Sequence, residues 1–244
     1  MLLKGKFALN LITKNEMGLN YIALISKTKL LNEREFNMEC HLVPEMYCSL
    51  LRDYSTHFIQ RVNVIISDEQ NNLSTDILNI KTIKSTYLHF DFKKYLSLDK
   101  YGRKKMQLEA VHKGMLEITK KENWPIDPLI KAYNACLEKN LEYQFNIGES
   151  KFARNRQYKV GLWCNWDMDY IEVYWILYDK NNYERQRNLL TRRLSYEGSF
   201  VYFLKWKWVD NTNFSVEEAY RYGKDEKWEI DILPFIEHCP PTAF

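Results

Sequence analysis

The sequence has little glycine and proline, with 8 and 6 of these residues among 244. Loops that cradle phosphates depend on glycine, and none of the patterns GxGxxG, GxxxxGK[ST] or GxSxG occurs. With 45% hydrophobic and 27% charged residues, the composition is typical of a folded chain and excludes a low-complexity or disordered one. We therefore expect a globular protein with no bound cofactor.

Histidine and cysteine are also scarce and scattered. The five histidines form no HxxxH, HxH or HExxH pair, and the five cysteines are widely spaced with no CxxC. The sequence therefore predicts no metal site, and buried thiols in a reducing cytoplasm. A catalytic cysteine–histidine pair that only folding brings together stays open as an alternative.

Long apolar runs and a strong net charge are absent as well. No run approaches the roughly 18 apolar residues of a membrane span. The first residues, MLLKGKFALNLITKNE, do not fit a secretory signal, because Asn10 interrupts a short apolar stretch. The net charge is only +3, with +5 in residues 1–122 and −2 in residues 123–244. We expect no membrane association and no global attraction to nucleic acid.

The first third of the chain has strand patterns around one short helix. The range 33–43 is predicted as a strand because Phe36, Met38, Cys40 and Leu42 alternate with polar residues. Pro44 favours a helix over residues 44–54. Further strands are predicted at residues 4–14, 20–27, 57–67, 76–83 and 85–92.

The middle of the chain is helical. Asp99 is a predicted N-cap for a helix over residues 100–123, in which Tyr101, Leu108 and Met115 recur seven apart. A breaker, NWPIDP, separates it from a second helix over residues 128–141, with Asp127 as the predicted N-cap. The short link indicates an antiparallel helix pair.

The C-terminal half is rich in aromatic residues, and six of the seven tryptophans lie between residues 158 and 228. Strands separated by polar turns are predicted at residues 142–147, 157–166, 170–178, 183–194, 200–209, 216–222 and 226–232, before an irregular tail. The order favours an α+β fold with largely antiparallel sheets flanking a central two-helix layer. Because no linker composition occurs, we expect one domain over residues 1–244, with lobes 1–122 and 123–244 as the alternative.

The aromatic strands divide into faces. Residues 170–178 are apolar on both faces, which indicates a strand that is buried on both faces, or buried on one face and used for contact on the other. We expect one set of side chains to be core packing: Val173, Trp175, Leu204, Trp206 and Trp228.

A basic run that includes Arg154 and Arg156 directly precedes the aromatic strand at Val160. A second basic group follows, and a regular strand over residues 183–194 would place Arg185, Arg187 and Arg193 on one face. Arginine beside aromatic rings suits an acidic protein partner or nucleic acid, and a solvated sheet face is the plain alternative. The predicted binding residues are Arg154, Arg156, Trp163, Trp166, Tyr170 and Tyr174.

Asp167 and Asp169 lie two residues apart in a predicted turn. Such a pair can share a hard cation, although aspartate also favours turns for its own hydrogen bonds. An enzyme with a dispersed site, built on these carboxylates and a histidine, is therefore a further alternative.

In general character the chain is similar to the varied immunity proteins with which bacteria neutralise cognate toxins, a likeness of composition that carries no motif. It implies a non-enzymatic, cytoplasmic, protein-binding module that occludes a toxin or effector. The alternatives are a protein that binds or processes nucleic acid through residues 151–159, and the dispersed-site enzyme.

Overall fold

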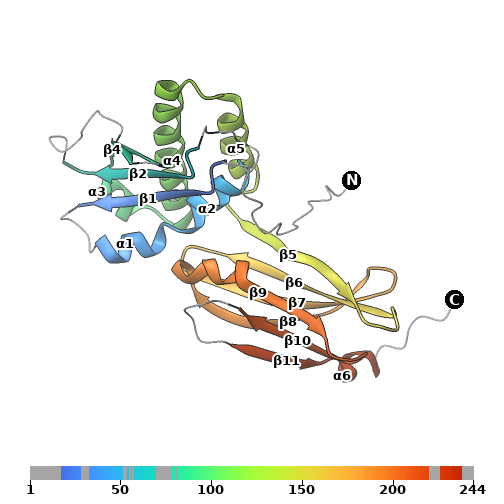
Figure 1. Ribbon diagram of the computed structural model, residues 1–244. Helices are drawn as coiled ribbons and strands as arrows, with labels where there is room; N and C mark the ends of the chain where they lie inside the picture. Colours follow the sequence, from blue (N-terminus) through green and yellow to red (C-terminus); the bar gives the residue numbers. More distant parts are fainter. Residues whose placement is uncertain are drawn as a thin grey trace. The chain divides into compact units, whose positions relative to one another are not determined.

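The computed structural model describes residues 18–28, 33–51, 54, 56, 58–69, 78–80, 82–219 and 226–237. These form two compact units (Figure 1). The N-terminal unit holds the described residues up to Tyr143 together with Asp167–Asp169. The C-terminal unit holds Gln144–Trp166 and the described residues from Tyr170 onward. The boundary between the units therefore lies after Tyr143, and not after residue 122 as in the two-lobe alternative. Whether the two units fold together as one domain stays a prediction. The strand predicted at 4–14, and His57, His238 and Cys239, lie outside the described residues.

The N-terminal unit contains a four-stranded sheet in the order β1-β2-β4-β3. Strands β1 (Tyr21–Lys27), β2 (Arg61–Ser67) and β4 (Ile83–His89) are parallel neighbours. Strand β3 (Leu78–Ile80) is antiparallel to β4. Parallel strands need a crossover connection, and between β1 and β2 it is helical.

That crossover occupies the range where a strand was predicted. Helix α1 (Glu33–Glu39) and the start of helix α2 (Leu42–Ser49) cover residues 33–43, so the strand prediction is wrong. Phe36 and Cys40, the two most buried residues of the alternating set before α2, are four apart. A spacing of four satisfies a helix as well as a strand, and the alternation was too short to separate them. The helix predicted at 44–54 is confirmed in part by α2.

The helix pair is confirmed as α4 (Lys100–Glu122) and α5 (Asp127–Glu138), which Figure 1 shows side by side after the short helix α3 (Phe92–Ser97). Asp99 Oδ1 accepts a hydrogen bond from the Gly102 N–H at 2.8 Å, as predicted for an N-cap. The N-cap of α5 is Ile126 and not Asp127.

Helix α4 packs on β2 and β4 through its apolar stripe. Leu108 and Met115 of the predicted stripe are fully buried, whereas Tyr101 is 45% exposed. Gly114 lies directly over Val64 of β2. The close approach of helix and sheet therefore depends on the absence of a side chain at residue 114.

The C-terminal unit contains two sheets. The first has the order β5-β6-β7-β8 and the second the order β11-β10-β9, and Figure 1 shows them stacked. The first consists of β5 (Tyr143–Phe152), β6 (Tyr158–Trp166), β7 (Tyr170–Asp179) and β8 (Glu184–Leu194). The second consists of β9 (Leu204–Trp208), β10 (Asn213–Glu218) and β11 (Lys227–Asp231). The chain is therefore an α+β protein with mostly antiparallel sheets.

Two predictions about this unit need correction. The 3₁₀ helix η2 (Ser195–Phe203) replaces the first part of the strand predicted at 200–209. Helix α6 (Leu233–Glu237) begins the tail that was expected to be irregular.

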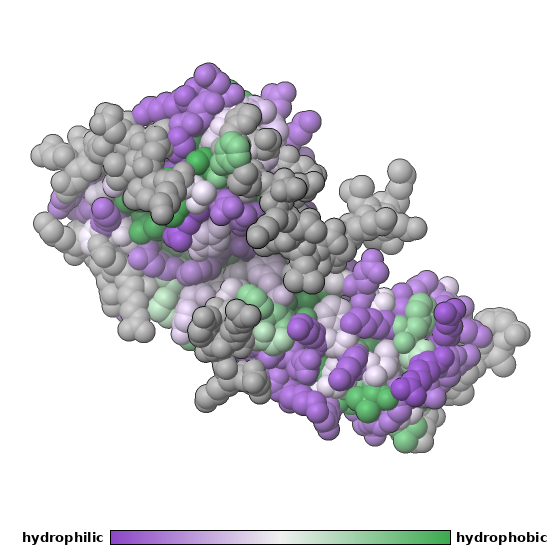
Figure 2. Space-filling view, in the orientation of Figure 1, coloured by the Kyte–Doolittle hydropathy of each residue, from purple (hydrophilic) through white to green (hydrophobic). Residues whose placement is uncertain are grey.

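The expected core set of the C-terminal unit is confirmed for four of its five residues. Val173, Trp175, Leu204 and Trp206 are all buried, and Trp228 is half-buried. On β9, Lys205 and Lys207 alternate with these side chains and are exposed. Figure 2 accordingly shows hydrophilic side chains, with smaller hydrophobic patches, where β9–β11 lie in Figure 1. Among the described residues, no helix has the length and apolar character to cross a membrane.

We predict that Gly114→Ala destabilises the chain, although alanine stabilises a helix by about 1 kcal/mol relative to glycine. A Cβ at this position would lie 2.6 Å from Val64 Cγ2 and 2.8 Å from Val64 Cγ1. Overpacking of this kind costs about 1–3 kcal/mol, so urea unfolding should give a net loss of up to about 2 kcal/mol. In a Val64→Ala background the same change should become neutral or stabilising. Stabilisation in the wild-type background would contradict this packing.

Candidate interaction face

The β5–β8 sheet has a buried face and an open face. On β7, Ile171, Val173, Trp175 and Leu177 are buried. The alternate residues on β7 are mostly half-buried, and their partners on β6 share their face. We call this side the outer face; on β6 and β7 it carries Lys159, Trp163, Asn165, Tyr170, Glu172, Tyr174, Ile176 and Tyr178.

Two β-bulges set which residues of β8 reach the outer face. The β7–β8 register shifts between Val173 and Tyr174 and between Leu177 and Tyr178. Each shift leaves one extra residue on β8 and reverses the alternation beyond it. The β8 residues opposite the outer residues of β7 are Glu184, Arg187, Leu189, Arg192 and Leu194.

The bulges overturn the prediction that Arg185, Arg187 and Arg193 share one face. Arg193 lies opposite buried Ile171, and its Nη2 pairs with Glu218 at 2.6 Å and Glu226 at 2.8 Å. Arg185 pairs instead with Asp179 at 2.7 Å. Arg187 and Arg192 are therefore the arginines of the outer face. A glycine in β8 could have indicated a bulge, and with it the change of face. Residues 184–194 contain none, so the sequence gives no sign of the register shifts.

Cations lie over aromatic rings across the outer face. The guanidinium carbon of Arg187 is 4.6 Å from the ring centre of Trp163, and that of Arg192 is 4.0 Å from Tyr170. Lys159 Nζ lies 5.2 Å from the ring centre of Tyr178 and 5.8 Å from that of Phe152 on β5. These distances suit cation–π attraction, so the face has an aromatic layer below and a cationic layer above.

A carboxylate lies beside the guanidinium of each of these arginines, Arg187 and Arg192. Glu184 accepts hydrogen bonds from Arg187 Nε and Nη2, both at 2.9 Å. The hydrogen bond from Arg187 lowers the pKa of Glu184, and the same bond raises the pKa of Arg187. Glu172 Oε1 lies 3.7 Å from Arg192 Nε, and Glu172 also accepts from the Tyr174 hydroxyl at 2.9 Å.

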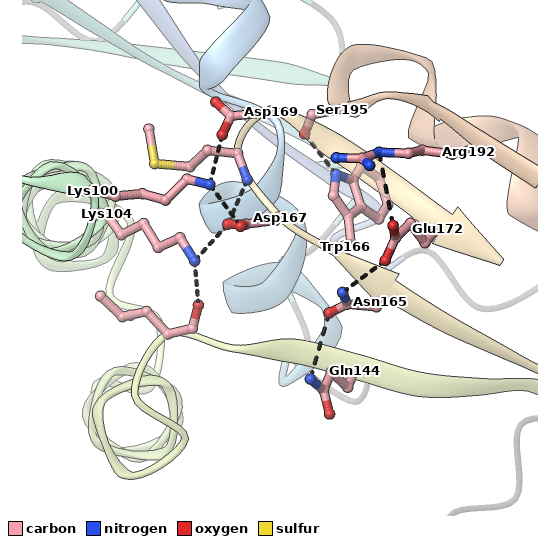
Figure 3. Close-up of polar contacts among 12 residues, drawn as sticks. Lys100, Lys104, Gln144, Asn165, Trp166, Asp167, Asp169, Glu172, Arg192 and Ser195 are labelled. Carbon is pink, nitrogen blue, oxygen red and sulfur yellow. Dashed lines mark hydrogen bonds and ion pairs between the residues drawn. The ribbon is translucent and has the colours of Figure 1, made fainter. Parts of the chain in front are cut away.

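A polar network continues from Glu172 along the sheet. Asn165 Nδ2 donates to Glu172 at 3.4 Å, and Gln144 Nε2 of β5 donates to Asn165 at 3.4 Å (Figure 3). Beside this network, Leu189 and Leu194 are each 49% exposed. The outer face thus combines stacked arginine, aromatic rings and exposed apolar side chains, the composition of a protein interface core.

Three of the six predicted binding residues lie on the outer face: Trp163, Tyr170 and Tyr174. Trp166 does not, because it is 4% exposed and its Nε1 donates to Ser195 Oγ at 2.8 Å in the core. Arg154 and Arg156 lie in the β5–β6 turn, where Arg156 adopts a left-handed φ of 55°. Both are exposed, and neither forms an ion pair with a described residue.

Asp167 and Asp169, which belong to the N-terminal unit, face lysines of α4. Lys100 Nζ lies 2.7 Å from Asp167 and 2.6 Å from Asp169, and Lys104 Nζ lies 2.7 Å from Asp167 (Figure 3). Two ammonium groups already neutralise the pair that was considered for a hard cation, and they would repel one. Within the described ranges, no group of three or more histidine, cysteine or acidic residues is placed to hold a metal.

His112 and three of the buried cysteines have environments that suit a structural role. The Tyr47 hydroxyl is hydrogen-bonded to His112 Nδ1 at 2.8 Å and donates to the Leu129 carbonyl at 3.2 Å. Burial lowers the pKa of His112 and so favours the neutral imidazole. Burial raises the pKa of the Cys136 thiol to about 12, and a thiol that stays protonated is a poor nucleophile. Burial also raises the pKa of the Cys40 and Cys164 thiols.

Comparison with known proteins adds no relative: no protein-family model, curated protein or solved structure matches the chain. The function must therefore be argued from the residues themselves.

We predict that Asp167 stabilises the N-terminal unit in a pH-dependent way. Burial raises the pKa of its carboxyl, but the hydrogen bonds from Lys100 and Lys104 outweigh burial and hold the pKa below its usual value. Stability is then present above the unfolded pKa of about 3.9 and is lost as pH falls through the lower folded pKa. Asp167→Asn should cost about 1–2 kcal/mol at neutral pH, and the gap to wild type should close in acid.

Urea unfolding followed by far-UV circular dichroism, which reports the helices of the N-terminal unit, measures this gap. Asp169→Asn is the matched control, because that carboxylate is 61% exposed and its removal should cost less than about 1 kcal/mol. Equal stability of Asp167→Asn and wild type at neutral pH would refute the role of Asp167.

Proposed function

We propose that the chain is a non-enzymatic protein-binding module that contacts its partner through the outer face of the β5–β8 sheet. The observation that carries this proposal is the layering of Arg187 and Arg192 on Trp163 and Tyr170. Arginine, tryptophan and tyrosine dominate the binding energy of protein interfaces. A stacked arginine is also pre-ordered, so less side-chain entropy is lost on binding.

The size of the outer face supports the proposal. Four strands about 4.8 Å apart and about 30 Å long give a face of roughly 600 Å² once side chains extend its width. A standard interface buries about 800 Å² on each partner. The outer face alone therefore supplies about three quarters of the area that a standard interface needs, and the bordering turns would have to supply the rest.

The sharpest version of the proposal is an immunity or inhibitor protein that occludes the active site of a toxin or effector in the cytoplasm. Occlusion needs a rigid surface, and strands hydrogen-bonded along their length supply one. An inhibitor of this kind needs no catalytic group of its own.

Nucleic-acid binding is the second candidate, and one observation favours it. Arg154 and Arg156 are exposed without an ion-pair partner among the described residues. Binding through them would weaken steeply with salt. Absence of salt-dependent binding to single- and double-stranded oligonucleotides would exclude this candidate.

The protein-binding proposal predicts that Leu189→Glu abolishes partner binding, because it places a charge at an exposed apolar position of the outer face. Tagged chains would be purified from the native host and the bound proteins compared. Val209→Glu is the matched control, since Val209 is 52% exposed and follows β9 of the other sheet. A protein retained by wild type and Val209→Glu should be lost at least about tenfold from Leu189→Glu.

Thermal unfolding establishes that both variants are folded. If Leu189→Glu and Leu194→Glu retain the same proteins as wild type, the outer face is not the binding site. The inhibitor version further predicts that cells expressing the captured protein grow only when wild type, and not Leu189→Glu, is co-expressed.

A further inference from the structure

We infer that the partner presents carboxylates to the outer face and that Arg187 and Arg192 bind them. This inference rests on the proposed function and adds the chemistry of the partner. It follows from three features of the face: how each arginine is held, which of its donors are left, and the balance of charge around it.

Arg192 is positioned without using its hydrogen-bond donors. Its guanidinium lies over the Tyr170 ring at 4.0 Å, and its Nε is 3.7 Å from Glu172, which is an ion pair too long for a hydrogen bond. The side chain is 56% exposed. A guanidinium has five N–H donors in a planar fork that matches a carboxylate. None of these donates to another described residue, so the fork is available to a partner.

Arg187 is held more firmly and keeps part of its fork. Nε and Nη2 each donate to Glu184 at 2.9 Å while the guanidinium lies over Trp163. Two of five donors are used, which leaves three. The side chain is 36% exposed. Arg187 and Arg192 are five positions apart on β8, so the carboxylates they bind would be roughly 15 Å apart.

The charge balance favours an acidic protein over a nucleic acid. On the outer face, the cations Lys159, Arg187 and Arg192 stand beside the carboxylates Glu172 and Glu184. Their sum is only +1, and the two carboxylates would repel a continuous phosphate backbone. A protein can place single carboxylates at the two arginines and apolar groups elsewhere.

The surroundings of the arginines point the same way. Leu189 and Leu194, exposed between and beside the arginines, match apolar side chains of a protein. A nucleic-acid base could stack on Tyr170 or Trp163 only after displacing the arginine that already covers the ring. The outer face therefore suits an acidic protein surface with interspersed apolar residues.

The test is selection from a random dodecapeptide library on the immobilised full-length chain. Recovered peptides should be enriched in aspartate, glutamate and apolar residues. Their affinity, measured by fluorescence polarisation, should fall at least about tenfold in Arg187→Gln and in Arg192→Gln. Arg61→Gln is the matched control, because Arg61 also lies over a tyrosine, at 5.0 Å from Tyr21, but in the N-terminal unit. Arg192→Glu should bind a peptide whose key acidic residue is changed to lysine.

The remaining outcomes separate this inference from the proposed function. If the recovered peptides are not enriched in acidic residues but fail to bind Leu189→Glu, the carboxylate inference is wrong and the proposed protein-binding face still stands. Peptides insensitive to Leu189→Glu, Arg187→Gln and Arg192→Gln would overturn both. Tighter binding to oligothymidylate than to any peptide, lost in Arg192→Gln, would overturn the inference in favour of nucleic acid.

Discussion

The outer face depends on the register between β7 and β8. The bulge between Val173 and Tyr174 brings Arg187 to the side that carries Arg192, Trp163 and Tyr170, and leaves Arg193 on the opposite side. The bulge between Leu177 and Tyr178 then places Glu184, and not Arg185, on the outer face. Without them, strict alternation would place Arg187 and Arg193 on one face of β8 and Arg192 on the other. Bulges thus turn a strand rich in arginine into one that stabilises the core on one side and presents stacked cations on the other.

The aromatic residues of the C-terminal unit have two distinct roles. Trp175, Trp206 and Trp166 are buried between or beside the sheets and account for packing. The rings of the outer face are not needed to fill that core, since their strand already buries Ile171 and Val173 on the other side. A group of aromatic rings on the solvent side of a sheet is the kind of patch that marks an interaction site.

Much of the fold could be predicted from local patterns. The helix pair followed from the spacing of Leu108 and Met115 and from Asp99 as N-cap, because caps and seven-residue repeats are local signals. The faces of β7 and β9 followed from alternation. The strand prediction at residues 33–43 failed because the spacing of four between Phe36 and Cys40 fits both a strand and a helix. The parallel pairing of β1 with β2, which requires a crossover connection, is a long-range property.

The candidate face was harder to predict than the fold. The aromatic half of the face could be assigned from β7 alone, including Tyr170 and Tyr174. Trp166 was misassigned, since a tryptophan at the end of a strand looks the same in sequence whether or not Gly198 leaves room for its ring in the core. Arg187 and Arg192 could not be distinguished from their neighbours, because the shifts in register that select them have no signature in the sequence.

The central claim is that the outer face is covered by a partner in the complex. Hydroxyl-radical footprinting of the chain, alone and with the protein captured from the native host, tests this most directly. The account predicts that Trp163, Tyr174 and Tyr178 become protected, while Tyr101, 45% exposed on α4, keeps its labelling. Unchanged labelling of the outer face in a stoichiometric complex would contradict the account.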